Sequence, residues 1–257
     1  MKLAAISYDS EAILKFFADR HQIEYPMLAD PDSKIIKAYG VFNHEATGMQ
    51  KGFARPGYFF IDANGVIKEK FFEARYRERL TGNSIIAKLF PELGQEVTET
   101  VDAPHLKLAL EQSDRTGVPG TRITVYADVQ LPPDVHVYAP GTQGYRPVKL
   151  ALDAAPDLMF GPVEYPSSLT LYLPAIKEKV PVYEGKFRIS QEVNVNTSAG
   201  FWGSLGKDGK SIPITGKLEY QACDKTMCFV PTSVPVKWEI QVFPLDRTRA
   251  PIEIRHK

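Results

Sequence analysis

The sequence predicts a multidomain α+β chain, with an α/β first part followed by an all-β antiparallel sandwich. Up to about residue 95, apolar positions with helical spacing alternate with short strand-like runs. After that point helical periodicity nearly disappears, and about nine short β-type runs follow one another between proline and glycine turns. The 257 residues, 44% of them hydrophobic, are enough for two separate cores.

The first part shows specific start and stop signals. Ser10 is a candidate N-cap, followed by an apolar helical face. The run Tyr58–Ile61 is apolar throughout, as in a buried central strand, and the turn residues after it predict a hairpin. The expected elements are a strand at Leu3–Ser7, a helix after Ser10, a helix at Ser33–Tyr39, strands at Tyr58–Ile61 and Val66–Phe72, and a helix opened by Asn83.

The polar, acidic stretch Gln95–Ala103 reads as a linker. The predicted domains are therefore residues 1–95 and 104–257, joined by residues 96–103. The strands expected in the second domain are Leu106–Leu110, Arg122–Gln130, Val135–Tyr138, Val148–Leu152, Leu169–Leu173, Val180–Tyr183, Phe187–Val195, Lys217–Tyr220 and Val234–Phe243.

Composition excludes several classes of function. Lysine plus arginine and aspartate plus glutamate both number 31, so nothing favours nucleic acid or an anionic membrane as a partner. No apolar run approaches the ~20 residues of a membrane helix, so we expect no membrane insertion by this chain. The apolar run Leu3–Ile6 is shorter than the roughly 7–15 residues of a signal-peptide core. We also expect no cofactor.

Four segments in the first part carry a resemblance to a known family. They are Leu3–Ser10, Tyr25–Pro31, Lys37–Val41 and Arg55–Asp62. In order and spacing they resemble the peroxiredoxin, or AhpC/TSA, antioxidant branch of the thioredoxin-like redoxin families. The resemblance implies a thioredoxin-like domain that lacks its first strand–helix unit, where that family carries its reactive cysteine. No cysteine precedes Cys223, so we expect no peroxidase activity from this chain alone.

Two interpretations of this difference stay open. In one, Met1 is internal or misassigned, and the catalytic cysteine of an antioxidant enzyme is encoded upstream. In the other, the domain is a relic scaffold. By the same resemblance, Arg55 and Pro56 mark a vestigial thioredoxin-like site, with Pro56 either cis, facing a thiol, or an ordinary trans proline that starts a strand.

The strongest motif is the segment Tyr220–Pro231, which contains both cysteines of the chain, Cys223 and Cys228. Four residues separate them, and β-type runs flank the pair, so it is expected at the end of a hairpin. There the Cα atoms can approach to the ~5.5–6 Å of a disulfide. The closed loop is short, which makes the stabilisation by such a bridge small, and a short exposed bridge is readily reduced. Zinc is disfavoured, because no histidines cluster nearby.

The cysteine segment, together with His136–Gly141 and Val182–Gly185, resembles the N-terminal periplasmic domains of the DsbD family of transmembrane disulfide reductases. The resemblance implies an immunoglobulin-like sandwich and a redox-active disulfide. That disulfide exchanges electrons with a thioredoxin-like redox protein or a membrane disulfide reductase, in the periplasm or another extracytoplasmic space. One cysteine attacks and the other resolves the mixed disulfide, in an order that the sequence leaves open.

Several neighbours of the cysteines are candidates for shielding the disulfide or docking the partner, with ordinary core packing as the alternative. They are Tyr220, Met227, Phe229, His136 and Tyr138. The leading hypothesis is a thiol–disulfide oxidoreductase with Cys223 and Cys228 as its catalytic residues. The alternative is an immunoglobulin-like binding or scaffold domain, in which the bridge only staples a hairpin.

Overall fold

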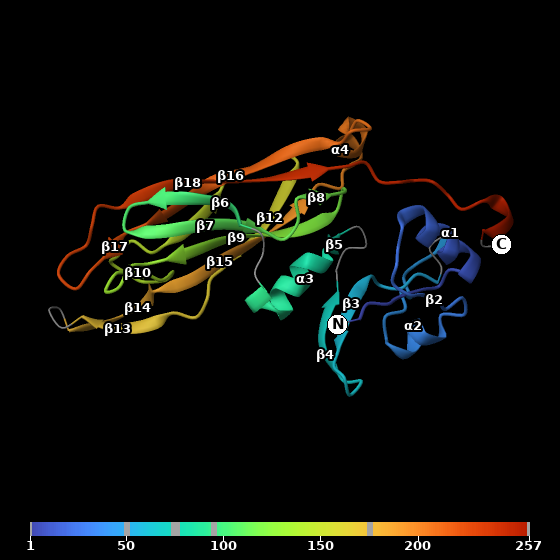
Figure 1. The fold of residues 1–257 in the computed structure, drawn as a ribbon, viewed down its shortest axis with the longest axis horizontal. Helices are drawn as coiled ribbons and strands as arrows, with labels where there is room; N and C mark the ends of the chain where they lie inside the picture. Colours follow the sequence, from blue (N-terminus) through green and yellow to red (C-terminus); the bar gives the residue numbers. More distant parts are fainter. Residues whose placement is uncertain (1, 49–51, 73–77, 94–96, 174–176, 256–257) are drawn as a thin grey trace. The chain divides into compact units, whose positions relative to one another are not determined.

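The computed structural model describes residues 2–48, 52–72, 78–93, 97–173 and 177–255, and the chain divides into two compact units (Figure 1). The first unit comprises Met1–Tyr76 and Asp246–Lys257, and the second comprises Arg77–Leu245. The first mixes helices with short strands, whereas the second is built mainly of strands. This agrees with the multidomain, strand-rich chain expected from the sequence.

The first unit holds two small sheets. Strands β1 and β2 pair in parallel, and β3 and β4 form an antiparallel hairpin. The described elements are β1 (Ala5–Ser7), α1 (Glu11–His21), β2 (Met27–Ala29), α2 (Lys34–Ala38), β3 (Gly57–Ile61), β4 (Ile67–Phe72) and the 3-10 turn η3 (Ile252–Ile254).

Local capping explains where the helices of this unit begin and end. The side chain of Ser10 accepts a hydrogen bond from the backbone N–H of Ile13, as predicted for an N-cap. Helix α1 ends at Gln22, which is in the left-handed region with φ 54°. Helix α2 begins where the buried carboxylate of Asp30 accepts hydrogen bonds from the N–H groups of Lys34 and Ile36, both at 2.9 Å.

The expectation of a buried central strand at Tyr58–Ile61 is wrong. Strand β3 pairs with β4 in a two-stranded sheet, and Tyr58 and Ile61 are 38% and 41% exposed. An apolar run is buried only where further layers cover it, and a two-stranded sheet provides few of them.

The C-terminal segment belongs to the first unit through contacts with α1. The guanidinium of Arg20 donates a hydrogen bond from Nε to Asp246 Oδ2 at 2.7 Å and from Nη2 to Thr248 Oγ1 at 2.9 Å. The hydrogen bond from Arg20, joined by hydrogen bonds from Thr248, holds the pKa of the Asp246 carboxyl well below its ordinary value. The chain therefore returns to the first unit after completing the second.

The second unit is a sandwich of mostly antiparallel sheets. One sheet has the order β12-β15-β9-β7-β6, with β5 beside β9, another has the order β11-β16-β18-β8, and a third has the order β13-β14-β10-β17. The strands are β5 (Arg79–Leu80), β6 (Val97–Ala103), β7 (Leu106–Gln112), β8 (Thr116–Gly117), β9 (Thr121–Gln130), β10 (His136–Tyr138), β11 (Lys149–Leu152), β12 (Leu158–Glu164), β13 (Leu169–Leu173), β14 (Glu178–Glu184), β15 (Lys186–Val195), β16 (Lys210–Tyr220), β17 (Ala222–Cys223) and β18 (Thr232–Val242).

One continuous core lies between these sheets. Strand β18 shows why the sequence folds this way, because every second residue from Val234 to Val242 is buried, with Trp238 at its centre. These side chains share a cluster with Leu108 of β7 and Ile123 of β9. The period-two pattern thus packs the sheet of β18 face to face against the sheet that contains β7 and β9.

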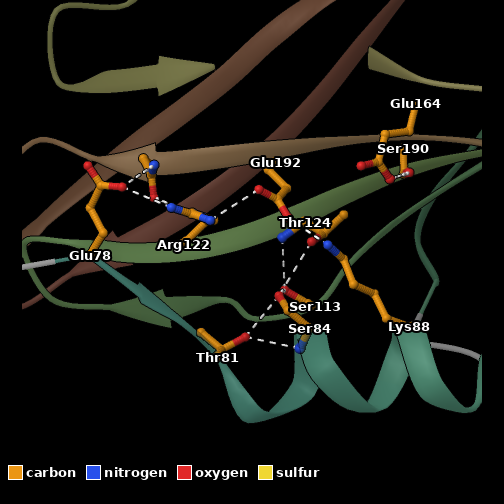
Figure 2. A network of polar contacts seen from close by, with 11 residues as sticks. Glu78, Thr81, Ser84, Lys88, Ser113, Arg122, Thr124, Glu164, Ser190 and Glu192 are labelled. Atoms are coloured by element: carbon orange, nitrogen blue, oxygen red, sulfur yellow. Dashed lines mark hydrogen bonds and ion pairs between the residues drawn. The ribbon is translucent and has the colours of Figure 1, made fainter. Parts of the chain in front are cut away.

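Helix α3 (Gly82–Leu89), followed by the 3-10 turn η2 (Pro91–Leu93), belongs to the second unit rather than to the first. Ser84 Oγ donates a hydrogen bond to Ser113 Oγ at 2.8 Å, and Ser113 Oγ accepts one from the backbone N–H of Thr124 at 3.0 Å (Figure 2). Lys88 forms an ion pair with Glu192 at 2.6 Å. These contacts fix α3 to strands β9 and β15.

Residues 97–103, expected to be a linker, form the edge strand β6. It pairs with β7 from Val97 to Ala103. Polar, acidic residues on the open side of an edge strand hide its strand character in the sequence. The compact units divide between Tyr76 and Arg77, and the domain bounds at 95 and 104 stay a prediction. The short helix α4 (Ala199–Ser204) completes the unit.

Candidate functional site

Cys223 and Cys228 face each other across a tight hairpin and are joined by a disulfide. The N–H of Asp224 donates to the carbonyl of Met227 at 2.9 Å, and the N–H of Phe229 donates to the carbonyl of Ala222 at 2.8 Å. The cysteines therefore occupy a non-hydrogen-bonded pair, the closest type of cross-strand neighbour. Their Cα atoms are 3.9 Å apart, closer than the separation expected from the sequence, because strands at such a pair approach most closely.

The four-residue loop between the cysteines is organised by Asp224. Its Oδ1 accepts hydrogen bonds from the Thr226 hydroxyl at 2.7 Å, the Thr226 N–H at 2.7 Å and the Met227 N–H at 2.8 Å. These hydrogen bonds lower the pKa of the Asp224 carboxyl, and the one from the Thr226 side chain makes the largest contribution. Lys225 forms an exposed ion pair with Asp134 at 2.6 Å. The loop is thus shaped by its own polar groups.

The two cysteines differ sharply in their exposure to solvent. Cys223 is 1% exposed and packs in a small cluster with Val180 and Val182 of β14, whereas Cys228 is exposed. Beside Cys228, Met227 is 57% and Val230 is 82% exposed. An approaching molecule therefore meets Cys228 first, within an apolar rim.

The side chain of Tyr138, on β10, contacts the exposed cysteine. Its hydroxyl lies 3.8 Å from Cys228 Sγ, and its ring stacks on Tyr145 with centroids 4.2 Å apart. Tyr145 in turn donates a hydrogen bond to Glu178 Oε2 at 3.0 Å. Burial raises the pKa of the Tyr138 hydroxyl, with a smaller contribution from Glu178, so this group stays a neutral donor near the sulfur.

His136 lies across from the buried cysteine. Strand β10 is flanked by β17 and β14, and the register pairs His136 with Cys223 on one side and with Glu184 on the other. The imidazole is 5% exposed, and among the described residues its Nε2 has no hydrogen-bond partner. Burial lowers the pKa of His136, while the charges of Glu184 and Asp224 act in the opposite direction.

The other predicted neighbours take different positions. Tyr220 is a core residue whose hydroxyl donates to the carbonyl of Pro104 at 2.7 Å, and burial raises its pKa to about 12. Phe229 stacks on His105 with ring centroids 3.8 Å apart. Both side chains pack against the turn between β6 and β7.

The vestigial site predicted around Arg55 and Pro56 belongs to the first unit. Arg55 lines a cavity of about 420 Å³ together with Lys37, Phe42 and His44. No peptide bond among the described residues is cis, so Pro56 follows a trans bond. Both cysteines of the chain are in the second unit, so the first unit supplies no thiol to this site.

The sequence assigned no role at the site to two acidic neighbours, Glu178 and Glu184, although Glu184 lies in the segment Val182–Gly185 that carries the family resemblance. Both come from β14, which is separated from the cysteine segment by more than thirty residues of sequence. Their proximity depends on which strands pair and in which register, and no local pattern encodes that.

Comparison with known proteins places both halves of the chain. Residues 1–70 match the AhpC/TSA family, and residues 108–238 match the family described as thiol:disulfide interchange protein DsbD, N-terminal. No curated protein matches the chain. Among the described residues, no helix is both long and apolar enough to cross a membrane.

Two solved structures show distant similarity. The N-terminal periplasmic domain of ScsB from Proteus mirabilis is 14% identical with a TM-score of 0.40, over 56% of this chain and 51% of that one. The reduced N-terminal domain of DsbD from Neisseria meningitidis is 14% identical with a TM-score of 0.29, over 46% of this chain and 75% of that one. This chain spans about half the length of the ScsB structure.

The DsbD match covers 131 of the 257 residues, just over half of the chain, and includes both cysteines of the disulfide. The chain therefore belongs to the family of DsbD N-terminal thiol:disulfide interchange domains, with an AhpC/TSA-family segment preceding that domain.

Proposed function

We propose that this chain is a thiol–disulfide oxidoreductase module whose Cys223–Cys228 pair exchanges electrons with a thioredoxin-like partner. The observation that carries the proposal is the unequal exposure of the two cysteines, one 1% exposed and one open to solvent. Exchange through a mixed disulfide requires one sulfur that a partner can reach and a second that stays close by to resolve the intermediate. The hairpin supplies both.

In this mechanism Cys228 is the sulfur that partners contact. A donor thiolate attacks Cys228 Sγ, the Cys223–Cys228 bond breaks, and the electron pair stays on Cys223, which takes up a proton. The second thiolate of the donor then attacks the donor sulfur that is bonded to Cys228. A disulfide forms within the donor, and Cys228 leaves as a thiolate. The reduced module passes the two electrons on when Cys228 attacks an oxidised partner and Cys223 displaces it.

The surroundings of Cys228 support this role. The neutral Tyr138 hydroxyl, 3.8 Å from the sulfur, is placed to donate a hydrogen bond to the thiolate. Exposed Met227 and Val230 offer apolar contact area beside the reactive atom. A partner with an apolar surface around its own disulfide fits this rim.

The same proposal covers compartment and partner class. A working disulfide belongs in an oxidising space, so the proposed exchange assigns this module to the periplasm or another extracytoplasmic space. Its partner is a thioredoxin-like redox protein or a membrane disulfide reductase. The equal numbers of acidic and basic residues offer no attraction for nucleic acid.

A glutathione redox titration, read by thiol alkylation and mass, tests the proposal. A potential above about −250 mV places the pair among exchangeable disulfides and supports electron transfer. A potential below about −300 mV marks a structural bridge. In that case the disulfide only stabilises the hairpin, and the unit is a binding or scaffold domain.

A further inference from the structure

A single row of side chains crosses three strands and the hairpin beside the disulfide. The pairs Cys228–Cys223, Cys223–His136 and His136–Glu184 are successive cross-strand neighbours. Directly opposed residues in antiparallel strands project from the same face, with Cβ atoms about 4.5–5.5 Å apart. His136 is therefore the side-chain neighbour of Cys223 on the side away from Cys228.

The position of Tyr138 confirms which face this is. Tyr138 lies two residues after His136 on β10, so the two side chains share a face, and their rings meet edge to face at 5.5 Å. The Tyr138 hydroxyl contacts Cys228 Sγ. The imidazole and the disulfide thus lie on the same side of the sheet.

The buried cysteine has a proton to lose. Resolution of a mixed disulfide requires the Cys223 thiolate, because the thiolate and not the thiol is the nucleophile. Burial disfavours that ionisation, and at 1% exposure Cys223 has little access to water as a base. A neighbouring group able to take the proton removes this obstacle.

His136 has the properties of such a group. It is 5% exposed, and its Nε2 has no partner among the described residues, although most buried polar atoms in proteins have one. The charged groups around it are Glu184 on β14 and Asp224 in the hairpin, while Lys225 is engaged with Asp134 and Tyr138 is a neutral phenol. A neutral imidazole next to two carboxylates can accept a proton and share its charge with them.

We propose that His136 is the proton acceptor and donor for Cys223, an inference that rests on the proposed thiol–disulfide exchange. The Cys223 S–H proton moves to the imidazole, and the thiolate attacks Cys228 Sγ. The Cys223–Cys228 bond forms while the bond between Cys228 and the partner sulfur breaks, and the partner leaves as a thiolate. When a donor reduces the disulfide, the imidazolium returns the proton to the departing Cys223 thiolate.

Stopped-flow reaction of the reduced full chain with the aromatic disulfide DTNB separates the two steps. Attack by Cys228 releases the first thionitrobenzoate, and resolution by Cys223 releases the second. We expect His136→Gln to leave the first phase within about twofold and to slow the second about 100-fold near neutral pH, the scale of general-base catalysis. The second phase of the variant should rise about tenfold per pH unit, whereas that of the wild type should be flat above the imidazole pKa.

Two further variants complete the test. Glu184→Gln keeps the imidazole but removes a charge that favours its protonation, so the midpoint of the second-phase pH profile should move to lower pH. His21→Gln, in the first unit, should behave as wild type in both phases. If His136→Gln does not fold, the shift with Glu184→Gln decides the question.

The outcomes separate this inference from the proposed function. A wild-type second phase and pH profile in His136→Gln, or an unmoved midpoint in Glu184→Gln, overturns the role of His136 and leaves the exchange reaction intact. A wild-type protein in which reduced Cys228 gives no first phase contradicts the exchange proposal itself.

Discussion

Two buried polar clusters in the second unit contrast in how completely their groups are paired. Between α3 and the sheet, the hydroxyls of Ser84, Ser113 and Thr124 bond to one another at 2.8–3.4 Å, and Ser113 also accepts from a backbone N–H (Figure 2). Beside the hairpin, the Nε2 of His136 has no partner among the described residues, and the Tyr138 hydroxyl lies 3.8 Å from Cys228 Sγ.

The difference in pairing indicates that one cluster stabilises the fold and that the other can take part in chemistry. An unpaired buried polar group costs about 1–3 kcal/mol, whereas a paired one contributes to stability. The hydroxyls of the α3 cluster are hydrogen-bonded to one another, as is expected of a contact that holds the helix against the sheet. The hairpin cluster retains unused donor and acceptor capacity next to a disulfide, which is where a proton or a partner sulfur can use it.

The largest expected effect comes from removing the exposed cysteine. Cys228→Ala should abolish exchange, because Cys223 alone is too buried to be reached by a partner. Cys223→Ala should keep the first attack and accumulate a mixed disulfide with a thioredoxin-like protein, detected as a covalent adduct by mass. Equal trapping by both variants would contradict the assignment of Cys228 as the contact sulfur.

Breaking the satisfied cluster should affect stability but not exchange. Ser84→Ala deprives Ser113 and Thr124 of a buried partner and should lower the free energy of unfolding of the unit by about 1–3 kcal/mol, measured in urea. The exposed Ser233→Ala on β18 is the control, expected within about 0.5 kcal/mol of wild type. A changed rate of DTNB reaction in Ser84→Ala would mean that the two clusters are coupled.

Removing one hydroxyl at the hairpin should change chemistry rather than stability. Tyr138→Phe deletes the donor beside Cys228 Sγ, so the pKa of the reduced Cys228 thiol should rise by about 0.5–1 unit. The pH dependence of iodoacetamide alkylation measures this pKa. Tyr145→Phe, whose hydroxyl donates to Glu178, should move it less. An equal shift in both variants would show that ring packing, not the hydroxyl, is responsible.

The smallest effect is expected at the loop carboxylate. The pKa of Asp224 is lowered in the folded protein, so its stabilising effect is complete above the unfolded value of about 4 and is lost as pH falls through the folded pKa. Asp224→Asn should therefore be less stable than wild type at pH 7 and equally stable near pH 2. Urea unfolding at the two pH values tests this, and a constant difference would assign the effect to shape alone.

The sequence predicted those elements whose signals are local. Ser10 caps its helix as expected, and the β-type run predicted at Val234–Phe243 corresponds to strand β18. Strand β12 was missed because Gly161 and Pro162 interrupt it, where its pairing with β15 shifts register between Phe160 and Val163. The edge strand β6 has the polar, acidic sequence that is typical of a linker, so its sequence alone does not predict a strand.

The features of the site also divide into those that local sequence predicts and those that depend on the fold. The spacing of Cys223 and Cys228 pointed to a hairpin disulfide, and a family resemblance brought His136 and Tyr138 into consideration. The facing of His136 toward Cys223 and Glu184 depends on strand pairing between distant segments, and the exposure of one cysteine but not the other depends on what packs over each. Neither property is written in local sequence.

Because the chain returns to its first unit, a single cut in the backbone between the units does not separate them. The polypeptide passes between the units twice, after Tyr76 and after Leu245. A protease cut at one crossing leaves the units covalently joined through the other, so separating them takes two cuts. A fragment that stops at Leu245 would keep the whole sandwich and its cysteine pair, yet it would deprive Arg20 of Asp246 and Thr248 and so loosen the unit that the sandwich interrupts.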